Sequence, residues 1–178
     1  MEMIKMNSTI EIEQKGITDL DVDAVVNAAN SMLQEGGGVC GAIFSEAGSY
    51  ELTRACDEIG GCPTGSAVIT PGFSLKAEYI IHAVGPIWRG GDENEEELLY
   101  SAYSRSLALA KEHDCSSIGF PVISSGIYGY PKRQAWQVAI RACMDFINDN
   151  PDYPIRIIFA VISDSSRELG ESVIDNML

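Results

Sequence analysis

Basic residues are few in this sequence. Twelve Lys and Arg stand against 26 Asp and Glu, so the formal net charge is -14 at pH 7. A nucleic-acid backbone or an anionic membrane is held mainly by clustered Lys and Arg, and here the basic residues are scattered along the chain. We therefore expect neither nucleic acid nor a membrane surface as a partner.

Histidine is scarce as well, and the cysteines form no metal-binding pattern. The two histidines, His82 and His113, complete no zinc-ligand spacing, and the five cysteines include no CxxC pair. We expect no bound metal. An odd set of cysteines without pairing motifs is typical of a reducing compartment, so a cytoplasmic location is expected. The cysteines are Cys40, Cys56, Cys62, Cys115 and Cys143.

Long apolar runs are missing too. Nowhere do about 18 apolar residues follow one another, and no apolar stretch follows the charges at the amino terminus. Neither secretion nor membrane insertion is expected. With 178 residues, 46% of them apolar and 21% charged, the chain is long enough to bury its own core. The composition predicts one globular domain over residues 1–178.

What is present is an alternation of strand-like and helix-like segments. Helical spacing predicts helices over residues 42–47, after Asp92, from about Lys132, and from Ser163 through Met177. This alternation predicts an α/β sandwich with helices on both faces of its sheet. Apolar runs predict strands at residues 9–13, 24–26, 66–70, 79–84, 118–123 and 155–162.

Two glycine-rich loops lie where a strand should hand over to a helix. The first contains residues 36–41 (GGGVCG) and follows the strand-like run at 24–26; the second is 124–131 (SSGIYGYP) and follows the run at 118–123. Glycine lets the backbone approach a ligand closely and point free N–H groups at it. The two loops therefore predict a phosphate or diphosphate ligand clamped from both sides.

Four acidic residues, Glu93, Glu95, Glu96 and Glu97, follow Asp92 closely. Such a run resembles a metal site. We interpret it instead as the solvated start of a helix, where the helix dipole favours negative charge.

Four ordered motifs carry a family resemblance. They are residues 25–30 (VVNAAN), 36–43 (GGGVCGAI), 81–88 (IHAVGPIW) and 120–131 (FPVISSGIYGYP). Together they resemble the macrodomain family, especially its bacterial MacroD-type branch, over nearly the whole chain. The resemblance implies a three-layer α/β/α sandwich with a mixed sheet of about six strands.

The same resemblance implies a ligand and a range of activities. The usual ligand of the family is ADP-ribose, free or attached to protein, and no cofactor is implied. Many members of this branch remove mono-ADP-ribose from acidic side chains or deacetylate O-acetyl-ADP-ribose, whereas other macrodomains only bind. The expected partner is therefore ADP-ribose or an ADP-ribosylated protein; the sequence does not indicate an oligomeric state.

Carried over residue by residue, the resemblance implies a set of ligand contacts. Asn30 would contact the distal ribose, and Asn27 would be a loop asparagine bonded to its own backbone. Ile17 and Ile162 would lie at the adenine end. The loop beneath the distal ribose would contain Gly37, Gly38 and Val39, and the diphosphate loop Ser125, Gly126, Ile127, Tyr128 and Gly129.

The sequence departs from the family pattern at both ends of this ligand. Cys40 stands where catalytic members carry an aspartate, and Phe44 where a histidine is common. Residues 14–18 (QKGIT) include no acidic side chain that could accept a hydrogen bond from the adenine amino group, and Gly16 has no side chain at all. Adenine recognition is therefore in question.

Three function classes follow from these departures. The first is a binding module for ADP-ribose or a related nucleotide diphosphate, in which Cys40 merely lines the pocket. The second is a hydrolase that acts without the acid by substrate assistance, and the third is an enzyme with Cys40 as a thiol nucleophile. Asn30 and Cys40 are the candidate catalytic residues. A serine hydrolase is disfavoured because no glycine precedes Ser124 or Ser125 by two residues.

Overall fold

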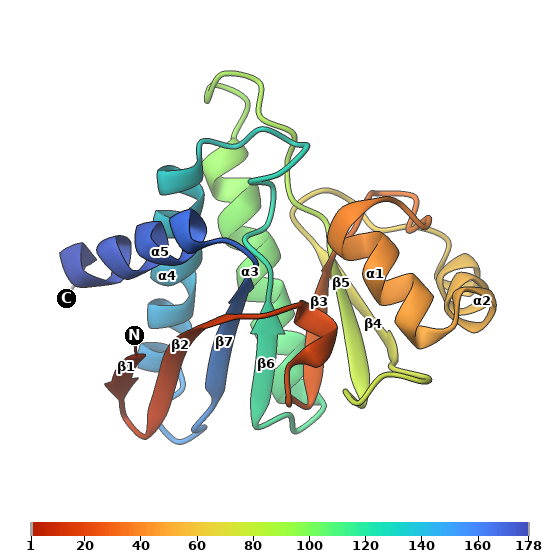
Figure 1. Ribbon diagram of the computed structural model, residues 1–178, viewed down its shortest axis with the longest axis horizontal. Helices are drawn as coiled ribbons and strands as arrows, with labels where there is room; N and C mark the ends of the chain where they lie inside the picture. Colours follow the sequence, from red (N-terminus) through yellow and green to blue (C-terminus); the bar gives the residue numbers. More distant parts are fainter. Residues whose placement is uncertain (1, 178) are drawn as a thin grey trace.

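Seven strands form a single mixed sheet in the computed structural model, which describes residues 2–177. Their order across the sheet is β1-β2-β7-β6-β3-β5-β4, and only the two edge strands, β1 and β4, pair antiparallel with their neighbours (Figure 1). The strands are β1 (Glu2–Lys5), β2 (Ser8–Gln14), β3 (Ala24–Ala28), β4 (Ala67–Pro71), β5 (Tyr79–Ala83), β6 (Ser117–Phe120) and β7 (Arg156–Val161).

Helices cover both faces of this sheet. One face carries α1, α2 and a short 3₁₀ helix η1, and the other carries α3, α4 and α5. None of the helices in the described part of the chain is long and apolar enough to span a membrane. The helices are η1 (Ile17–Asp19), α1 (Gly38–Ala47), α2 (Ser49–Ile59), α3 (Glu95–Glu112), α4 (Lys132–Asp149) and α5 (Asp164–Met177).

The core is divided by the sheet into two hydrophobic clusters. Strand β7 contributes to both, because successive side chains of a strand point to opposite faces. Ile157 and Phe159 pack into the cluster under α3, α4 and α5, whereas Ile158 packs into the cluster under α1 and α2. The predicted three-layer α/β/α sandwich is confirmed.

The structure differs from the expected elements at three places. Strand β1 adds a seventh strand at the edge of the sheet, where about six were expected. Helix α1 begins at Gly38 rather than at Ala42, so the last residues of the glycine loop form its first turn. Helix α2 was not predicted, although its apolar residues Leu52, Ala55, Cys56 and Ile59 recur at helical spacing.

Candidate functional site

The five parallel strands determine where the site lies. Because β2, β7, β6, β3 and β5 run in the same direction, their carboxyl ends meet at one edge of the sheet, where α/β proteins commonly bind ligands. A cavity of about 1110 Å³ opens there. Its walls are the segments that follow those strands, and they include residues 15–18, 28–30, 36–40, Gly85, 121–128 and 160–163.

The segment after β6 presents free amide groups to the cavity. Its turn is closed by two hydrogen bonds, from the Gly129 amide to the Gly126 carbonyl at 3.0 Å and from the Tyr130 amide to the Ser124 carbonyl at 2.9 Å. Within residues 2–177, the backbone amides of Gly126, Ile127 and Tyr128 donate no hydrogen bond. Three consecutive unpaired donors make a concave site suited to an anion.

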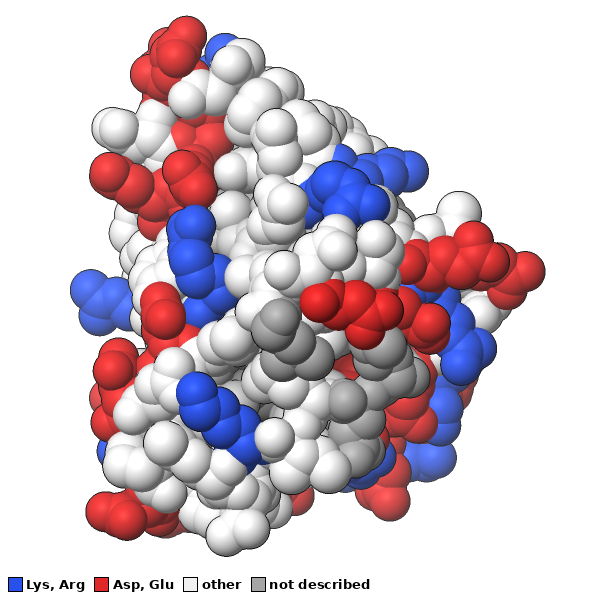
Figure 2. All heavy atoms as spheres, turned by 90° about the vertical axis from the view of Figure 1, so that its left-hand side faces the viewer, with Lys and Arg blue, Asp and Glu red and all other residues white. Residues whose placement is uncertain are grey.

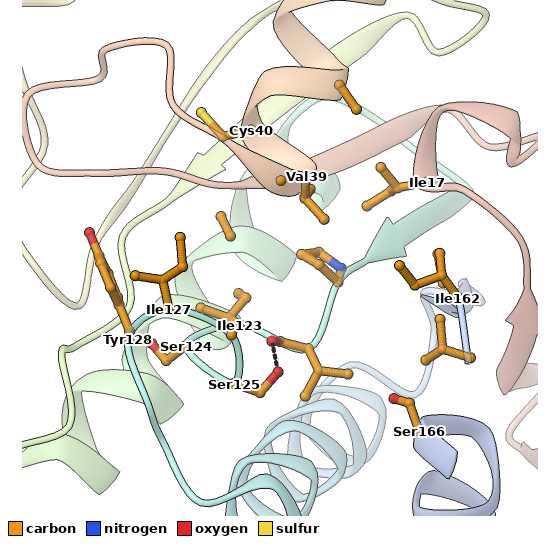
Figure 3. Close-up of a pocket in the computed structure, with 18 of the residues that line it drawn as sticks. Ile17, Val39, Cys40, Ile123, Ser124, Ser125, Ile127, Tyr128, Ile162 and Ser166 are labelled. Atoms are coloured by element: carbon orange, nitrogen blue, oxygen red, sulfur yellow. Dashed lines mark hydrogen bonds between the residues drawn. The ribbon is translucent and has the colours of Figure 1, made fainter. Parts of the chain in front are cut away.

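The first turn of α1 lies against the same cavity. Its amides at Gly38, Val39 and Cys40 have no intrahelical acceptor, because the first turn of any helix leaves its N–H groups free. Figure 3 shows Val39 from α1 and Ile127 from the segment after β6 at the same cavity. The two glycine loops therefore do converge on one space, as the sequence predicted.

The charged side chains that line the cavity are opposite in sign to the net charge of the protein. Among the described residues that line it, Lys15 and Lys132 are the only charged ones, and neither a carboxylate nor a histidine is present. The protein as a whole has a formal charge of -14. A cavity with free amides, two lysines and no acid is suited to an anionic ligand and offers no ordinary general base.

Asn30 lies at the cavity wall directly after β3. Its side-chain amide donates to the Gln34 carbonyl at 2.8 Å and its oxygen accepts from the Gln34 amide at 3.0 Å, which closes the loop over residues 30–34. The expected contact of Asn30 with a ribose stays a prediction. One amide hydrogen remains for it after these bonds.

Asn27 is not a loop residue, contrary to the expectation. It lies inside β3, fully buried, and its amide nitrogen is 3.0 Å from Nδ1 of His82 on β5. The other ring nitrogen of His82 is 3.0 Å from the Thr70 hydroxyl on β4. Burial lowers the pKa of His82 to about 4, so the ring is neutral and structural.

Cys40 lines the cavity, and among residues 2–177 no base contacts its thiol. Its thiol donates to the Gln34 carbonyl at 3.7 Å, and Figure 3 shows the side chain at the α1 end of the site. Both nitrogens of His82 are engaged elsewhere, and His113 lies at the end of α3 against Tyr79. The thiol-enzyme interpretation therefore lacks the base that it needs.

The other four cysteines are buried and free. Burial raises the pKa of Cys56 and of Cys115 to about 11, and raises those of Cys62 and Cys143 as well. These thiols are inert small hydrophobes. Among the described residues, no group of histidine, cysteine and acidic side chains could hold a metal ion.

The far end of the cavity contains apolar and hydroxyl groups. Ile17 is buried, whereas Ile162 is 86% exposed, and Figure 3 shows both on the side of the site away from Cys40. Gly16 contributes backbone only. The polar side chains in this part of the wall are Lys15, Thr18, Ser163, Ser165 and Ser166.

The acidic run at the start of α3 is not solvated throughout, and no metal site is found among the described residues. Glu95, at 1% exposure, accepts hydrogen bonds from the backbone amides of Arg89, Gly91 and Glu93 at 2.8, 2.9 and 2.6 Å. Burial of the carboxyl group opposes its ionisation, but the backbone donors outweigh that effect and lower the pKa of Glu95 to about 2. Glu96 and Glu97 are exposed, as expected.

Known proteins of similar sequence identify the family of this chain. The sequence pattern of the Macro domain family matches residues 26–139, from the middle of β3 to the first turns of α4, and includes both glycine loops. A macro domain-containing protein of Chlorobaculum tepidum is 47% identical over 168 residues, with 94% of this chain and 96% of the relative covered. The chain belongs to the macro domain family. The O-acetyl-ADP-ribose deacetylase of Escherichia fergusonii is 46% identical over 168 residues, covering 92% and 94% of the two chains.

Solved macrodomains share the whole fold. The Oceanobacillus iheyensis macrodomain with ADP has a TM-score of 0.93 at 37% identity, covering 99% of this chain and 95% of its own. The Trypanosoma brucei macrodomain in complex with ADP-ribose has a TM-score of 0.85 at 35% identity, covering 93% and 68%. The family resemblance carried by the four motifs is therefore confirmed.

Several cavity residues were missed by sequence reasoning. Lys132 follows Pro131 at the start of α4, and it was treated only as a helix residue. Gly85 also lines the cavity. It packs so closely on Ser124 that a Cβ there would overlap the serine hydroxyl. The hydroxyls of Ser163, Ser165 and Ser166 follow β7. Their position after a parallel strand was the available signal.

Proposed function

We propose that this macrodomain binds ADP-ribose, free or attached to protein, or a closely related nucleotide diphosphate. Its hydrolysis of ADP-ribosyl-protein or of O-acetyl-ADP-ribose is weak or absent. The observation that carries the proposal is the wall of the cavity: two sets of unpaired amides and two lysines, with no acid among the described lining residues. Neutral amides and lysines bind a diphosphate well even in an acidic protein.

The size and shape of the cavity support the same ligand. A volume of about 1110 Å³ is at the upper end for small-molecule sites and matches an extended dinucleotide-like molecule. In this proposal, Gly126, Ile127 and Tyr128 hold the diphosphate, and Asn30 with Gly37 and Gly38 holds the distal ribose. The adenine lies between Ile17 and Ile162.

Weak hydrolysis follows from the residues that would have to act on water. Cys40 stands beside the proposed distal ribose, and a neutral thiol accepts hydrogen bonds poorly. Loss of a positioned acid or base slows such reactions about 10²–10⁴-fold. Relatives named as O-acetyl-ADP-ribose deacetylases support the alternative, a hydrolase that works by substrate assistance or through Cys40.

Calorimetric titration of the parent and of Gly126→Val with ADP-ribose tests the binding proposal. A Cβ at Gly126 would meet no atom within 4 Å and φ is not positive there, so valine projects into open space without straining the fold. The parent is expected to bind, and the valine variant to bind at least about 100-fold more weakly, because its methyl groups occupy the diphosphate position.

Gly126→Ala is the graded control, since its single methyl group should weaken binding less than valine does. Thermal unfolding of all three proteins checks that the fold is kept. If Gly126→Val binds ADP-ribose as tightly as the parent, the assignment of this loop to the diphosphate is wrong. If the parent binds no ADP-ribose, the proposed function is wrong.

A further inference from the structure

The loop between β5 and α3 is built around one buried carboxylate. Glu95 is the first residue of α3, yet its side chain turns back onto the preceding loop instead of facing solvent. Its Oε2 accepts from the amides of Arg89 and Gly91, and its Oε1 accepts from the amide of Glu93. Three charge-assisted bonds from alternate residues fix the path of this loop.

Trp88 connects this loop to the segment that lines the cavity. Its backbone amide donates to the Tyr128 carbonyl at 2.8 Å, and its ring lies 4.7 Å from the ring of Tyr130. On the other side the loop packs onto the same ring, since a Cβ at Gly91 would be 3.0 Å from the Trp88 indole. Trp88 is therefore held between the Glu95 loop and residues 128–130.

Within residues 124–130, Ser124 and Tyr130 are buried, and the tip between them is largely exposed. Ser124 and Gly129 have φ values of 66° and 72°, in the left-handed region. Ile127, at the tip, is 95% exposed. The two turn bonds described above are local, whereas the Tyr128 carbonyl and the Tyr130 ring contact Trp88 in the loop before α3. Ser124 also packs on Gly85, so Trp88 provides one of the attachments of this segment to the rest of the molecule.

We infer that Glu95 is a positioning residue for the proposed diphosphate site, acting through Trp88 on residues 124–130. This inference rests on the proposed function, because it assigns the diphosphate to the amides of Gly126, Ile127 and Tyr128. Glu95 itself does not line the cavity. It sets where those amides point before the ligand arrives, and preorganised donors bind more tightly than mobile ones.

Glu95→Gln is the sharpest variant, since it keeps the size of the side chain. A carboxamide has one acceptor oxygen in place of two, so at least one of the three loop amides loses its partner and faces an NH₂ group. Glu97→Gln is the matched control, because Glu97 is exposed two residues away on the same helix. Trp88→Phe is a second variant. It replaces the indole that contacts Gly91 and Tyr130 by a smaller ring and keeps the backbone hydrogen bond to the Tyr128 carbonyl.

Affinities for ADP-ribose, ADP and adenosine distinguish positioning from general damage. We expect Glu95→Gln to weaken ADP-ribose and ADP about tenfold and adenosine less than about twofold, because only the first two carry a diphosphate. Trp88→Phe should give the same pattern. The double variant should be no weaker than the weaker single one, since both act along one route. Equal weakening of all three ligands, or none, would overturn the inference.

Amide hydrogen exchange in the free protein tests the coupling without any ligand. In Glu95→Gln the amides of Gly129 and Tyr130 should exchange about tenfold faster, while those of Phe120 and Phe159 in the sheet keep the parent rate. Unchanged exchange at Gly129 and Tyr130 would refute the coupling even if the parent binds ADP-ribose. Faster exchange in Glu95→Gln, together with a parent that binds no ADP-ribose, would instead refute the proposed function and leave the coupling standing.

Discussion

Cys40 is the residue at which we propose that binding and catalysis separate in this macrodomain. It lines the cavity beside the first turn of α1, and its thiol is bonded to the Gln34 carbonyl. Phe44, one turn further along α1, is buried and does not line the cavity. An aspartate at position 40 would therefore have room to place a carboxylate at the proposed ribose.

The first prediction concerns hydrolysis at this position. In a de-ADP-ribosylation assay on a glutamate-modified substrate, the parent and Cys40→Ala should both be slow, and Cys40→Asp should be at least about tenfold faster. The reason is that a carboxylate holds and polarises a water molecule, whereas a thiol and a methyl group do not. A fast parent abolished by Cys40→Ala would instead favour the thiol mechanism, and a fast parent indifferent to that change would favour substrate assistance.

The second prediction concerns the base. The polar side chains that line that end of the cavity are hydroxyls and Lys15. The carboxylate of Asp19 lies beside Gly16, where a Cβ would be 3.1 Å from it, but Asp19 does not line the cavity. A hydroxyl donates or accepts equally well, so it does not distinguish an amino group from a carbonyl. Calorimetric affinities for ADP-ribose and its inosine counterpart should therefore differ by less than about fivefold. A strong preference for adenine would mean that backbone groups or another side chain read the base.

At the scale of elements, a buried polar chain joins three strands under the site. Asn27 on β3, His82 on β5 and Thr70 on β4 form it, and the Asn27 oxygen is left without a partner. If the Asn27 amide donates to Nδ1, the ring must carry its proton on Nε2, which donates to Thr70. The neutral form of His82 is therefore required by the fold.

The third prediction is a pH dependence of stability from this histidine. The pKa of His82 is about 4 in the folded protein against 6.5 for the ordinary side chain, so between these values the unfolded chain binds the extra proton. Stability should therefore fall as the pH falls, by about 2 kcal/mol between about pH 7.5 and about pH 5. Urea unfolding at both pH values measures it. The loss should shrink in His82→Gln and persist in His113→Gln; an equal loss in all three proteins would contradict the assignment.

Most helices and strands could be predicted where their own residues form a continuous apolar run or a repeated helical spacing. The six expected strands and the helices after Asp92 and Lys132 have continuous apolar runs or repeated helical spacing, and the structure contains them all. Strand β1 is short and has neither. Helix α2 does have apolar residues at helical spacing, Leu52, Ala55, Cys56 and Ile59, and sequence reasoning missed them. Glu95 was misinterpreted because nothing local indicates that the amides of Arg89, Gly91 and Glu93 surround it.

At the scale of the whole molecule, the acidic surface opposes the proposed ligand. The net charge is -14, and Figure 2 shows acidic and basic side chains interspersed on one face rather than a basic patch. Lys15 and Lys132 line the cavity and would act on a bound anion at short range, although Lys15 also lies 3.5 Å from a Glu13 oxygen. The acidic surface would act from farther away. Salt screens the distant repulsion more strongly than the short-range attraction.

The fourth prediction follows from this difference in range. The affinity for ADP-ribose should rise roughly threefold between about 20 mM and about 200 mM NaCl, the reverse of the usual salt effect on anion binding. Calorimetry at the two salt concentrations measures it. With Lys15→Gln and Lys132→Gln combined, binding should be weaker at both concentrations. An affinity of the parent that falls with salt would mean that the lysines outweigh the field of the molecule.

The sequence by itself determined the fold class, the family and the two loops that form the cavity, because strand and helix periodicity and glycine motifs are local properties of the chain. That residues 1–178 form one domain and that Asn30 contacts a ribose remain predictions. Only the tertiary structure decided that Asn27 bonds His82, that Lys132 and Gly85 line the cavity, and that Glu95 is buried under the loop before α3. Each of these depends on distances between segments far apart in the chain or on the path of an irregular loop, which no local pattern encodes.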